Sequence, residues 1–437
     1  MFIVRAFSFL RASSFALTAL GMSILGPVAA RATGPDLVPV QIGNIVNHGQ
    51  DGTFQGYSVG VATCNLGDSP SWFCDADSPE CAATDHPILV VNLYRVRRSL
   101  TGIGFDQIGM SWVQHLTASA NGSLGKCGSC QAPPLGSRQL GAGCADTLTG
   151  AEASVRPLAR RSTVNPATVS FPFPFISPLP TTPSEQRLRV ARSDLDPAGN
   201  PGARFFLEVQ VLAADDLAAG NSDNNFVYRE VTVDPQNLDL IAVGPEVVGR
   251  PAIFAWRDVD PYVQLVRVEV PGTSPVEVFY VARAYFFCPT DDFGYHKYVI
   301  QNVNSDLAAQ RWAIEFRSAG DWDPPEARTL PHHSGEPYAT TPWVLEGCIF
   351  QERIMAMSCP TFAMDPDANA LRWGTAFSFR ADGDTSRASN LLRETFDLFK
   401  PWPVATVELT FPASRPQQFF SSDFETGDLR DWSGSEP

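Results

Sequence analysis

A long succession of short β-rich runs separated by turn residues is the strongest constraint on the fold of this chain. Leu37–Ile45 and Tyr57–Cys64 flank a Gly-rich turn, and Phe205–Leu212 alternates so that every second residue faces the same side. Similar runs recur from Leu238–Val243 to Val404–Phe411, and 36 Pro and 33 Gly residues supply turns between them. A period of two over short segments is typical of strands, and many short strands favour β-sandwiches. The chain is therefore predicted to be all-β, with two β-sandwich domains of immunoglobulin-like or jelly-roll-like type.

Two interruptions of this pattern give a predicted domain organisation. Residues of about 119–202 hold three Cys and many Pro and Gly, and they are expected to form a long, irregular, disulfide-bearing insertion. This insertion would belong to a first β-sandwich domain of residues 33–235. The motif Asp234-Pro235-Gln236-Asn237 predicts a boundary, which is followed by a second β-sandwich domain of residues 236–411. The polar residues 412–437 are predicted to be a flexible C-terminal tail.

One helix is expected in the second domain, at Thr385–Phe399. Thr385 is a suitable N-cap residue. Leu391, Leu392, Phe396 and Phe399 then recur at helical spacing.

The first 32 residues resemble a secretory signal peptide. Arg5 and Arg11 give a positive start, Ser14–Val28 is largely apolar, and Ala30-Arg31-Ala32 has the small-residue pattern of a cleavage site. The apolar run is short for a membrane span. We therefore expect an exported protein that is secreted, extracellular or periplasmic.

Charge and hydropathy restrict the partners of such an exported chain. Residues 1–32 carry three Arg and no acidic residue, so their removal lowers the formal net charge from −15 to −18. A strongly acidic surface repels phosphate backbones, so no nucleic-acid partner is expected. No second apolar run approaches ~20 residues, so no transmembrane segment is expected after the signal peptide.

Eight of the nine cysteines are predicted to form disulfides, because export brings a chain into an oxidising compartment. Cys74 and Cys81 are spaced to close a small loop. The spacing of Cys348 and Cys359 suits a disulfide that joins the two strands of a hairpin. Cys288 follows a strand-like run and is expected to be a buried free thiol. Two further pairs of undetermined connectivity complete the candidates, which are Cys64, Cys74, Cys81, Cys127, Cys130, Cys144, Cys348 and Cys359.

Two family resemblances follow from short motifs. Pro35-Asp36-Leu37-Val38, the strand end Asn65-Leu66-Gly67-Asp68, and the residues 213–225 with Gly220-Asn221-Ser222-Asp223-Asn224-Asn225 resemble the cell-adhesion-related (CARDB) immunoglobulin-like domain. This resemblance implies an immunoglobulin-like first domain with an adhesive or binding role. Phrases such as Asn369-Ala370-Leu371-Arg372-Trp373-Gly374-Thr375 resemble a family of uncharacterised secreted bacterial β-rich proteins, which implies no particular activity.

Three histidines of the first half are candidate metal ligands. His48, His86 and His115 are imidazoles that a β-sandwich can bring together, and imidazole suits copper or zinc. Calcium is a less favoured alternative, because two loops around Asp194 and Asp215 are rich in carboxylate and amide oxygens. Asp and Asn also favour turns without any metal, through local backbone hydrogen bonds.

The loop from His332 to Glu336 is the densest polar cluster of the chain. Its Ser334 lies beside two histidines, which suggests a hydrolase, although no nucleophile-elbow motif is present. The favoured interpretation remains a secreted or cell-surface, non-enzymatic binding or structural protein with an unidentified surface or extracellular ligand. The alternatives are a copper- or zinc-binding protein or metalloenzyme, and a hydrolase centred on this loop.

Overall fold

The structure, a computed structural model, describes most of the chain beyond the predicted signal peptide. The described residues are 32–74, 81–99, 102–116, 121–155, 158–170, 180–288, 293–316, 322–346, 354–383, 391–411 and 417–418. Residues 1–31, which are nearly all of the predicted signal peptide, and most of the predicted tail lie outside them.

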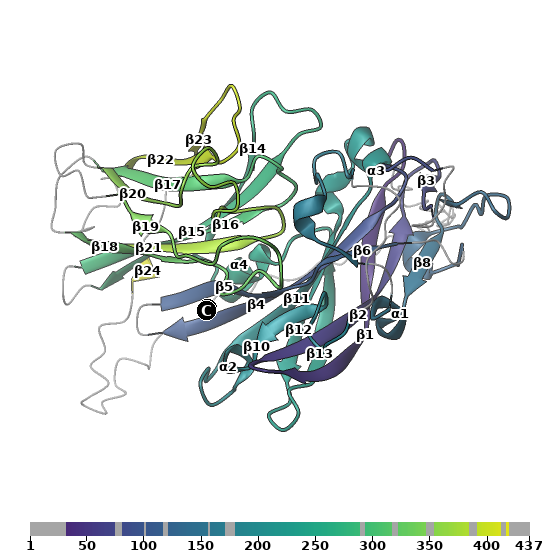
Figure 1. Ribbon diagram of the computed structural model, residues 1–437, viewed down its shortest axis with the longest axis horizontal. Coiled ribbons are helices and arrows are strands. Elements are labelled where there is room, and N and C mark those ends of the chain that lie inside the picture. Colours follow the sequence, from purple (N-terminus) through teal and green to yellow (C-terminus); the bar gives the residue numbers. More distant parts are fainter. Residues whose placement is uncertain are drawn as a thin grey trace, which may run out of the picture. The chain divides into compact units, whose positions relative to one another are not determined.

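An eleven-stranded antiparallel sheet makes up the first half (Figure 1). Its main path runs β1-β2-β10-β5-β4-β11-β12-β13, and β6, β8 and β9 attach to its sides. The sheet curls until β1 packs against β12 and β13 at the other end of the path, and the Tyr57 hydroxyl donates a hydrogen bond to the Leu238 carbonyl at 2.5 Å. The strands are β1 (Leu37–Asp51), β2 (Phe54–Asn65), β4 (Ile88–Ser99), β5 (Gly102–Met110), β6 (Val113–His115), β8 (Ala145–Leu148), β9 (Leu158–Ala159), β10 (Leu188–Ala191), β11 (Arg204–Leu212), β12 (Phe226–Val233) and β13 (Leu240–Val248).

Two further sheets face each other in the second half and form a β-sandwich. Trp312, Phe279, Phe377, Phe379 and Phe396 fill the core between them, and the Trp312 and Phe379 rings stack with centroids 4.9 Å apart. One sheet contains β14 (Gln264–Glu269), β15 (Val278–Cys288), β16 (Phe293–Asn302), β18 (Trp322–Arg328), β21 (Ala376–Gly383) and β24 (Gln417–Gln418). The other contains β17 (Ala309–Phe316), β19 (Val344–Leu345), β20 (Ile354–Ser358), β22 (Leu391–Leu398) and β23 (Thr406–Leu409). The predicted all-β class is confirmed.

Helices are short and lie at the ends of strands. They are α1 (Gly150–Ala153), α2 (Arg192–Leu195), α3 (Ala214–Ala219) and α4 (Ile253–Val259), with 3-10 turns η1 (Gly125–Cys127), η2 (Arg161–Thr163) and η3 (Ser222–Asn224). Two short strands, β3 (Ser71–Trp72) and β7 (Gln139–Leu140), pair with each other. None of the helices in the described ranges has the length and apolar character needed to cross a bilayer.

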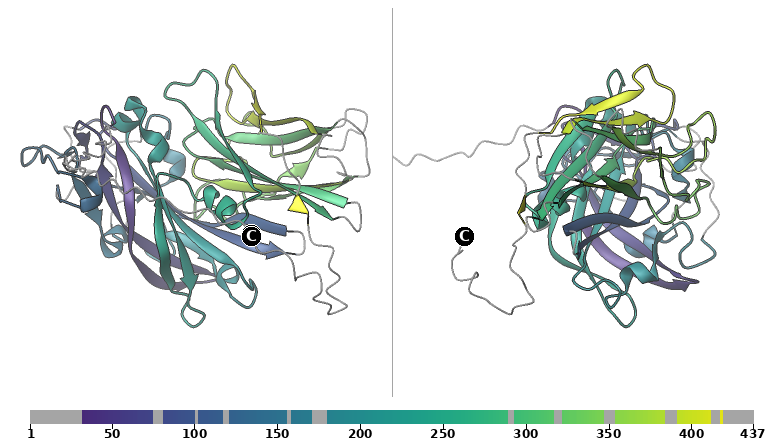
Figure 2. Two further views of the ribbon diagram at one scale, coloured as in Figure 1. Left: turned by 180° about the vertical axis from the view of Figure 1, so that it is seen from behind. Right: turned by 90° about the vertical axis from the view of Figure 1, so that its left-hand side faces the viewer.

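The β4–β5 hairpin connects the first sheet to the sandwich. It extends alongside the green C-terminal strands in Figure 1 and in the reverse view of Figure 2, and β5 packs against β21. Tyr94 and Phe105 of the hairpin share one hydrophobic cluster with Trp256 of α4 and Phe286 of β15. The first sheet also continues beyond the motif at 234–237, because β13 pairs with β12.

The predicted helix at Thr385–Phe399 is wrong for the residues that the structure describes. Leu391–Leu398 is strand β22, which pairs with β17 on one side and β23 on the other. Phe396 and Leu398 are buried at alternate positions, as a strand requires. The spacing of the apolar residues fits a helix as well as a strand. Hydrogen bonding to β17 on one edge and to β23 on the other shows that the segment is a strand.

The predicted insertion at about 119–202 contains more sheet structure than its composition suggests. Leu188–Ala191 forms β10, which lies between β2 and β5 in the middle of the first sheet. The other described residues of this segment form short strands, single turns and loops, and residues 119–120, 156–157 and 171–179 lie outside the description.

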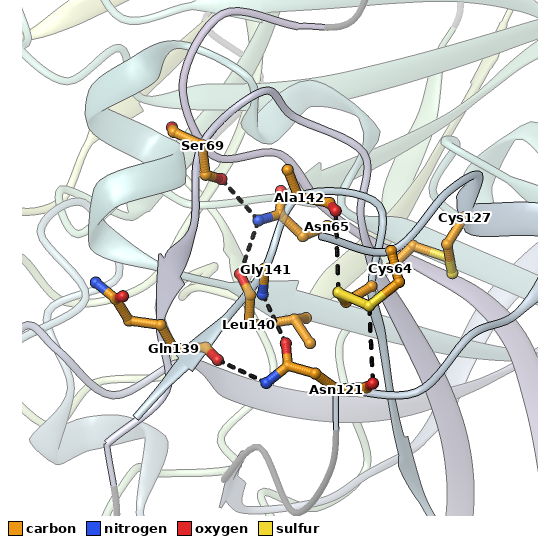
Figure 3. Close-up of a disulfide and its surroundings, with 11 residues drawn as sticks. Cys64, Asn65, Ser69, Asn121, Cys127, Gln139, Leu140, Gly141 and Ala142 are labelled. Carbon is orange, nitrogen blue, oxygen red and sulfur yellow. Dashed lines mark hydrogen bonds between the residues drawn. A yellow bond between two sulfur atoms is a disulfide. The ribbon is translucent and has the colours of Figure 1, made fainter. Parts of the chain in front are cut away.

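Three disulfides hold the loops beside β2. Cys74 pairs with Cys81 as expected, Cys64 pairs with Cys127, and Cys130 pairs with Cys144. Asn65 and Asn121 support this region by donating hydrogen bonds to loop carbonyls, as Figure 3 shows.

The predicted disulfide between Cys348 and Cys359 is not formed. Cys359 is a buried free thiol that packs in the sandwich core, where a thiol behaves as a small apolar group. Burial raises the pKa of this thiol to about 12. Cys348 and the side chain of Cys288 lie outside the description.

We expect the disulfides to contribute to stability according to the length of chain that each one closes. The Cys64–Cys127 bond spans 63 residues and the Cys74–Cys81 bond spans 7. Loop-closure entropy then predicts that the free energy of unfolding falls by about 4 kcal/mol in a Cys64→Ala/Cys127→Ala variant and by about 2.5 kcal/mol in a Cys74→Ala/Cys81→Ala variant. Guanidinium denaturation of both variants measures the difference, and equal losses would contradict this ranking.

Candidate functional site

A groove runs along the junction between the β4–β5 hairpin and the C-terminal sandwich. It consists of two adjoining hollows, which share Asp106 of β5 and Arg328 of β18. Strands β16, β18 and β21 supply one side, and β4 and β5 supply the other. The groove exists because the hairpin extends beyond the first sheet and places its polar face beside the sandwich.

Positive charge is concentrated in this groove although the chain as a whole is acidic. The formal net charge of the chain is −15. Among the side chains that the structure describes along the groove, five are cationic and three are acidic. The cations are Arg95, Arg97, Lys297, Arg328 and Arg380, and the acids are Asp106, Asp194 and Glu326.

Asp106 organises the middle of the groove. Its carboxylate lies 3.7 Å from Arg95 and 3.7 Å from Arg328, and it accepts a hydrogen bond from the Ser378 hydroxyl at 2.9 Å. Arg95 is buried and also pairs with Asp194 at 2.9 Å. The Arg95 guanidinium is therefore held in place, whereas the Arg328 side chain is 55% exposed.

Arg97 experiences the excess positive charge directly. Partial burial lowers the pKa of Arg97, and the nearby guanidinium of Arg95 lowers it further. Arg328 acts in the same direction, and Asp106 opposes both. An anion in this groove would relieve the mutual repulsion of these cations.

Core aromatic residues lie behind the charged walls of the groove. Phe105, Trp256, Tyr298 and Phe379 border it, but they are almost fully buried and their rings belong to the hydrophobic clusters of the interior. The indole Nε1 of Trp256 has no hydrogen-bond acceptor among the described residues. A buried N–H without an acceptor costs about 1–3 kcal/mol.

The His332–Glu336 loop is buried rather than open to substrate. Ser334 is 3% exposed, and its hydroxyl donates to the Met110 carbonyl at 2.7 Å, while His332 Nδ1 lies farther away at 3.4 Å. Burial lowers the pKa of His332 to about 3. Because the hydroxyl proton is directed to a carbonyl, Ser334 lacks the arrangement of a base-activated nucleophile.

Glu336 and His333 connect this loop to its neighbours. Glu336 accepts hydrogen bonds from the backbone N–H of Arg161 at 2.6 Å and from the Ser162 hydroxyl at 2.7 Å. His333 Nε2 lies 2.8 Å from Asn369 Oδ1, and its ring lines a second, smaller pocket together with Arg372.

The Arg161 side chain links the first sheet to the sandwich from a fully buried position. It donates to the carbonyls of Ser111 and Val91 on one side and to the Gly374 carbonyl on the other. Gly374 has a φ of +70°, and a Cβ there would lie 2.2 Å from Arg161 Nη1, so glycine is required at this position.

The structure brings together two of the three predicted histidine ligands. His86 Nδ1 and His115 Nε2 lie 3.0 Å apart in a fully buried position. His48 instead hydrogen-bonds to the Ser58 hydroxyl at 2.8 Å. Within the described ranges, the one His, Cys, Asp or Glu triad with metal-site spacing is Cys74, Cys81 and Asp85, and its two cysteines are joined in a disulfide.

The sequence offered little indication of the groove. Arg97, Lys297, Arg328 and Arg380 are spread over more than half of the chain, and only the pairing of β16 with β21 and of β21 with β18 brings the last three together. A recognisable local signal is the run of Arg residues at 95, 97 and 98 in an otherwise acidic chain.

Comparison with known proteins gives no family for this chain. No family model matches it, and no curated protein matches it.

The buried histidines predict that stability falls in mild acid. Burial lowers the pKa of His333 to about 4, so between that value and the ordinary value of 6.5 the unfolded chain binds a proton that the folded chain does not. Lowering the pH from about 7 to about 5 should therefore reduce the free energy of unfolding by about 2 kcal/mol through the titration of His333.

A His333→Gln variant tests this assignment, because glutamine can still hydrogen-bond Asn369 but does not titrate. Over the same pH change, we expect the free energy of unfolding of this variant to fall by about 2 kcal/mol less than that of the wild type. Urea denaturation at both pH values measures the two changes. Identical losses in the two proteins would show that His333 does not contribute.

Proposed function

We propose that this protein is an exported, non-enzymatic binding protein whose basic groove holds an anionic ligand. The observation that carries the proposal is the clustering of five Lys and Arg residues around three acids in a chain of net charge −15. Random placement of cations on such an acidic chain would not favour one groove. Guanidinium groups bind carboxylate and sulfate groups through paired hydrogen bonds.

The extent of the groove favours an elongated anionic ligand. The two hollows share Asp106 and Arg328, and we propose that one molecule occupies both. Cations on the walls suit the carboxylates of an acidic sugar chain, whereas the aromatic rings behind them are too deeply buried to contact it. We therefore propose a carboxylated oligosaccharide as the ligand class.

Export is supported by two independent features. The first 32 residues have the charge and apolar pattern of a signal peptide, and three disulfides hold the loops of the first half. A binding role also agrees with what the CARDB-like motifs imply.

The groove predicts measurable binding of an acidic oligosaccharide. Isothermal titration calorimetry with a hexagalacturonate probe should give binding that weakens as salt rises, because screening reduces charge attraction. The Arg97→Gln/Arg328→Gln variant should bind at least roughly 100-fold more weakly, since it loses two charge-assisted hydrogen bonds of about 1.5–3 kcal/mol each.

Two controls define the outcome of this experiment. Arg204→Gln removes an Arg that pairs with Glu230 outside the groove, so its affinity should equal that of the wild type. A neutral maltohexaose should not bind. The proposal fails if the wild type does not bind the acidic probe, or if the groove variant binds it as tightly as the Arg204 variant does.

A further inference from the structure

We propose that a second site, formed by Asp36, Asp216, Asn224 and Asn225, binds a calcium ion. These side chains come from two distant parts of the chain. Asp36 directly precedes β1, Asp216 lies in α3, and the two asparagines lie at the end of η3 and directly after it. The site lies in different residues from the basic groove, so it does not depend on the proposed function.

Contacts between the side chains bring the four residues into one cluster. The Asn225 amide donates to Asp216 Oδ2 at 2.5 Å, and the Asn224 amide hydrogen-bonds the Asp36 carboxylate. Asn221 donates from the same loop to the carbonyls of Thr33 and Pro35, at 3.0 and 2.7 Å. These hydrogen bonds therefore fix the segment that leads into β1 against the loop of residues 214–225.

One oxygen of each residue in the cluster is buried without a hydrogen-bond donor from the described part of the chain. These atoms are Asp36 Oδ1, Asp216 Oδ1, Asn224 Oδ1 and Asn225 Oδ1. Asp216 and Asn225 are fully buried, and Asp36 is 5% exposed. Both amides are oriented by the bonds from their nitrogens, so the oxygen of each is left to face another partner.

One cation can contact all four of these oxygens at the same time. A single water molecule donates hydrogen bonds to only two of them.

The donor set selects the kind of cation. All four donors are carboxylate or amide oxygens, which calcium prefers, whereas zinc and copper prefer nitrogen and sulfur. Two carboxylates balance the charge of a divalent ion. Calcium takes six to eight oxygens, so backbone carbonyls or water would complete the shell.

Thermal unfolding in EDTA and in millimolar CaCl2 tests the site. Calcium should raise the Tm of the full chain by about 2–5 °C, and dialysed protein should retain about one calcium per chain by elemental analysis. The Asp36→Asn/Asp216→Asn variant should lose both effects. In EDTA this variant should be at least as stable as the wild type, because it lacks the buried carboxylate pair.

Asp223→Asn is the matched control, because Asp223 belongs to the same loop but is exposed and pairs with Arg267. It should keep the calcium effect. The proposal is overturned if wild-type protein neither retains calcium nor gains stability from it, or if Asp223→Asn abolishes the effect as fully as the double variant. Should the double variant fail to fold, metal content and Tm of the wild type decide alone.

Discussion

The buried Arg161 guanidinium is the interaction on which the rest of the structure depends. A charge in this position is stable only when hydrogen bonds replace its lost hydration, and Arg161 obtains them from β4, from the segment after β5 and from the loop before β21. Gln107 reinforces the same junction, since its side chain donates to the Gly374 carbonyl and accepts from the Ala376 N–H. The spacing of β5 and β21, which form the walls of the groove, follows from these bonds.

The charged groups of the molecule form two arrangements of opposite sign, one along the open groove and one in a buried cluster. Around Asp106, guanidinium groups outnumber carboxylates, and an anion would complete the arrangement. Around Asp216, carboxylates and amide oxygens gather without a cation among the described residues. Each arrangement joins segments that are far apart in the sequence. A ligand bound at either place would therefore stabilise tertiary contacts that hold distant segments of the chain together.

The all-β class and the Cys74–Cys81 disulfide could be predicted from local patterns, whereas the functional geometry could not. Alternation along Phe205–Leu212 predicts a strand, and β11 is in fact buried on both faces, because Glu208 and Gln210 find hydrogen-bond partners in the interior. The apolar spacing around Phe396 fits both a helix and a strand, and only pairing with β17 and β23 decides between them. The groove depends on the order of strands in the sheets, and no local spacing encodes that order.

The position of β10 affects the order in which the first sheet can form. β2 and β5 lie on either side of a strand that comes almost eighty residues after β5 in the sequence. A chain that crosses a membrane from its N-terminus would present β1, β2, β4 and β5 before the strand that joins them. Until Leu188–Ala191 arrives, two edges of paired strands remain open to intermolecular pairing. The loop disulfides close within the segment that precedes this strand, and they would limit the freedom of the incomplete sheet during that interval.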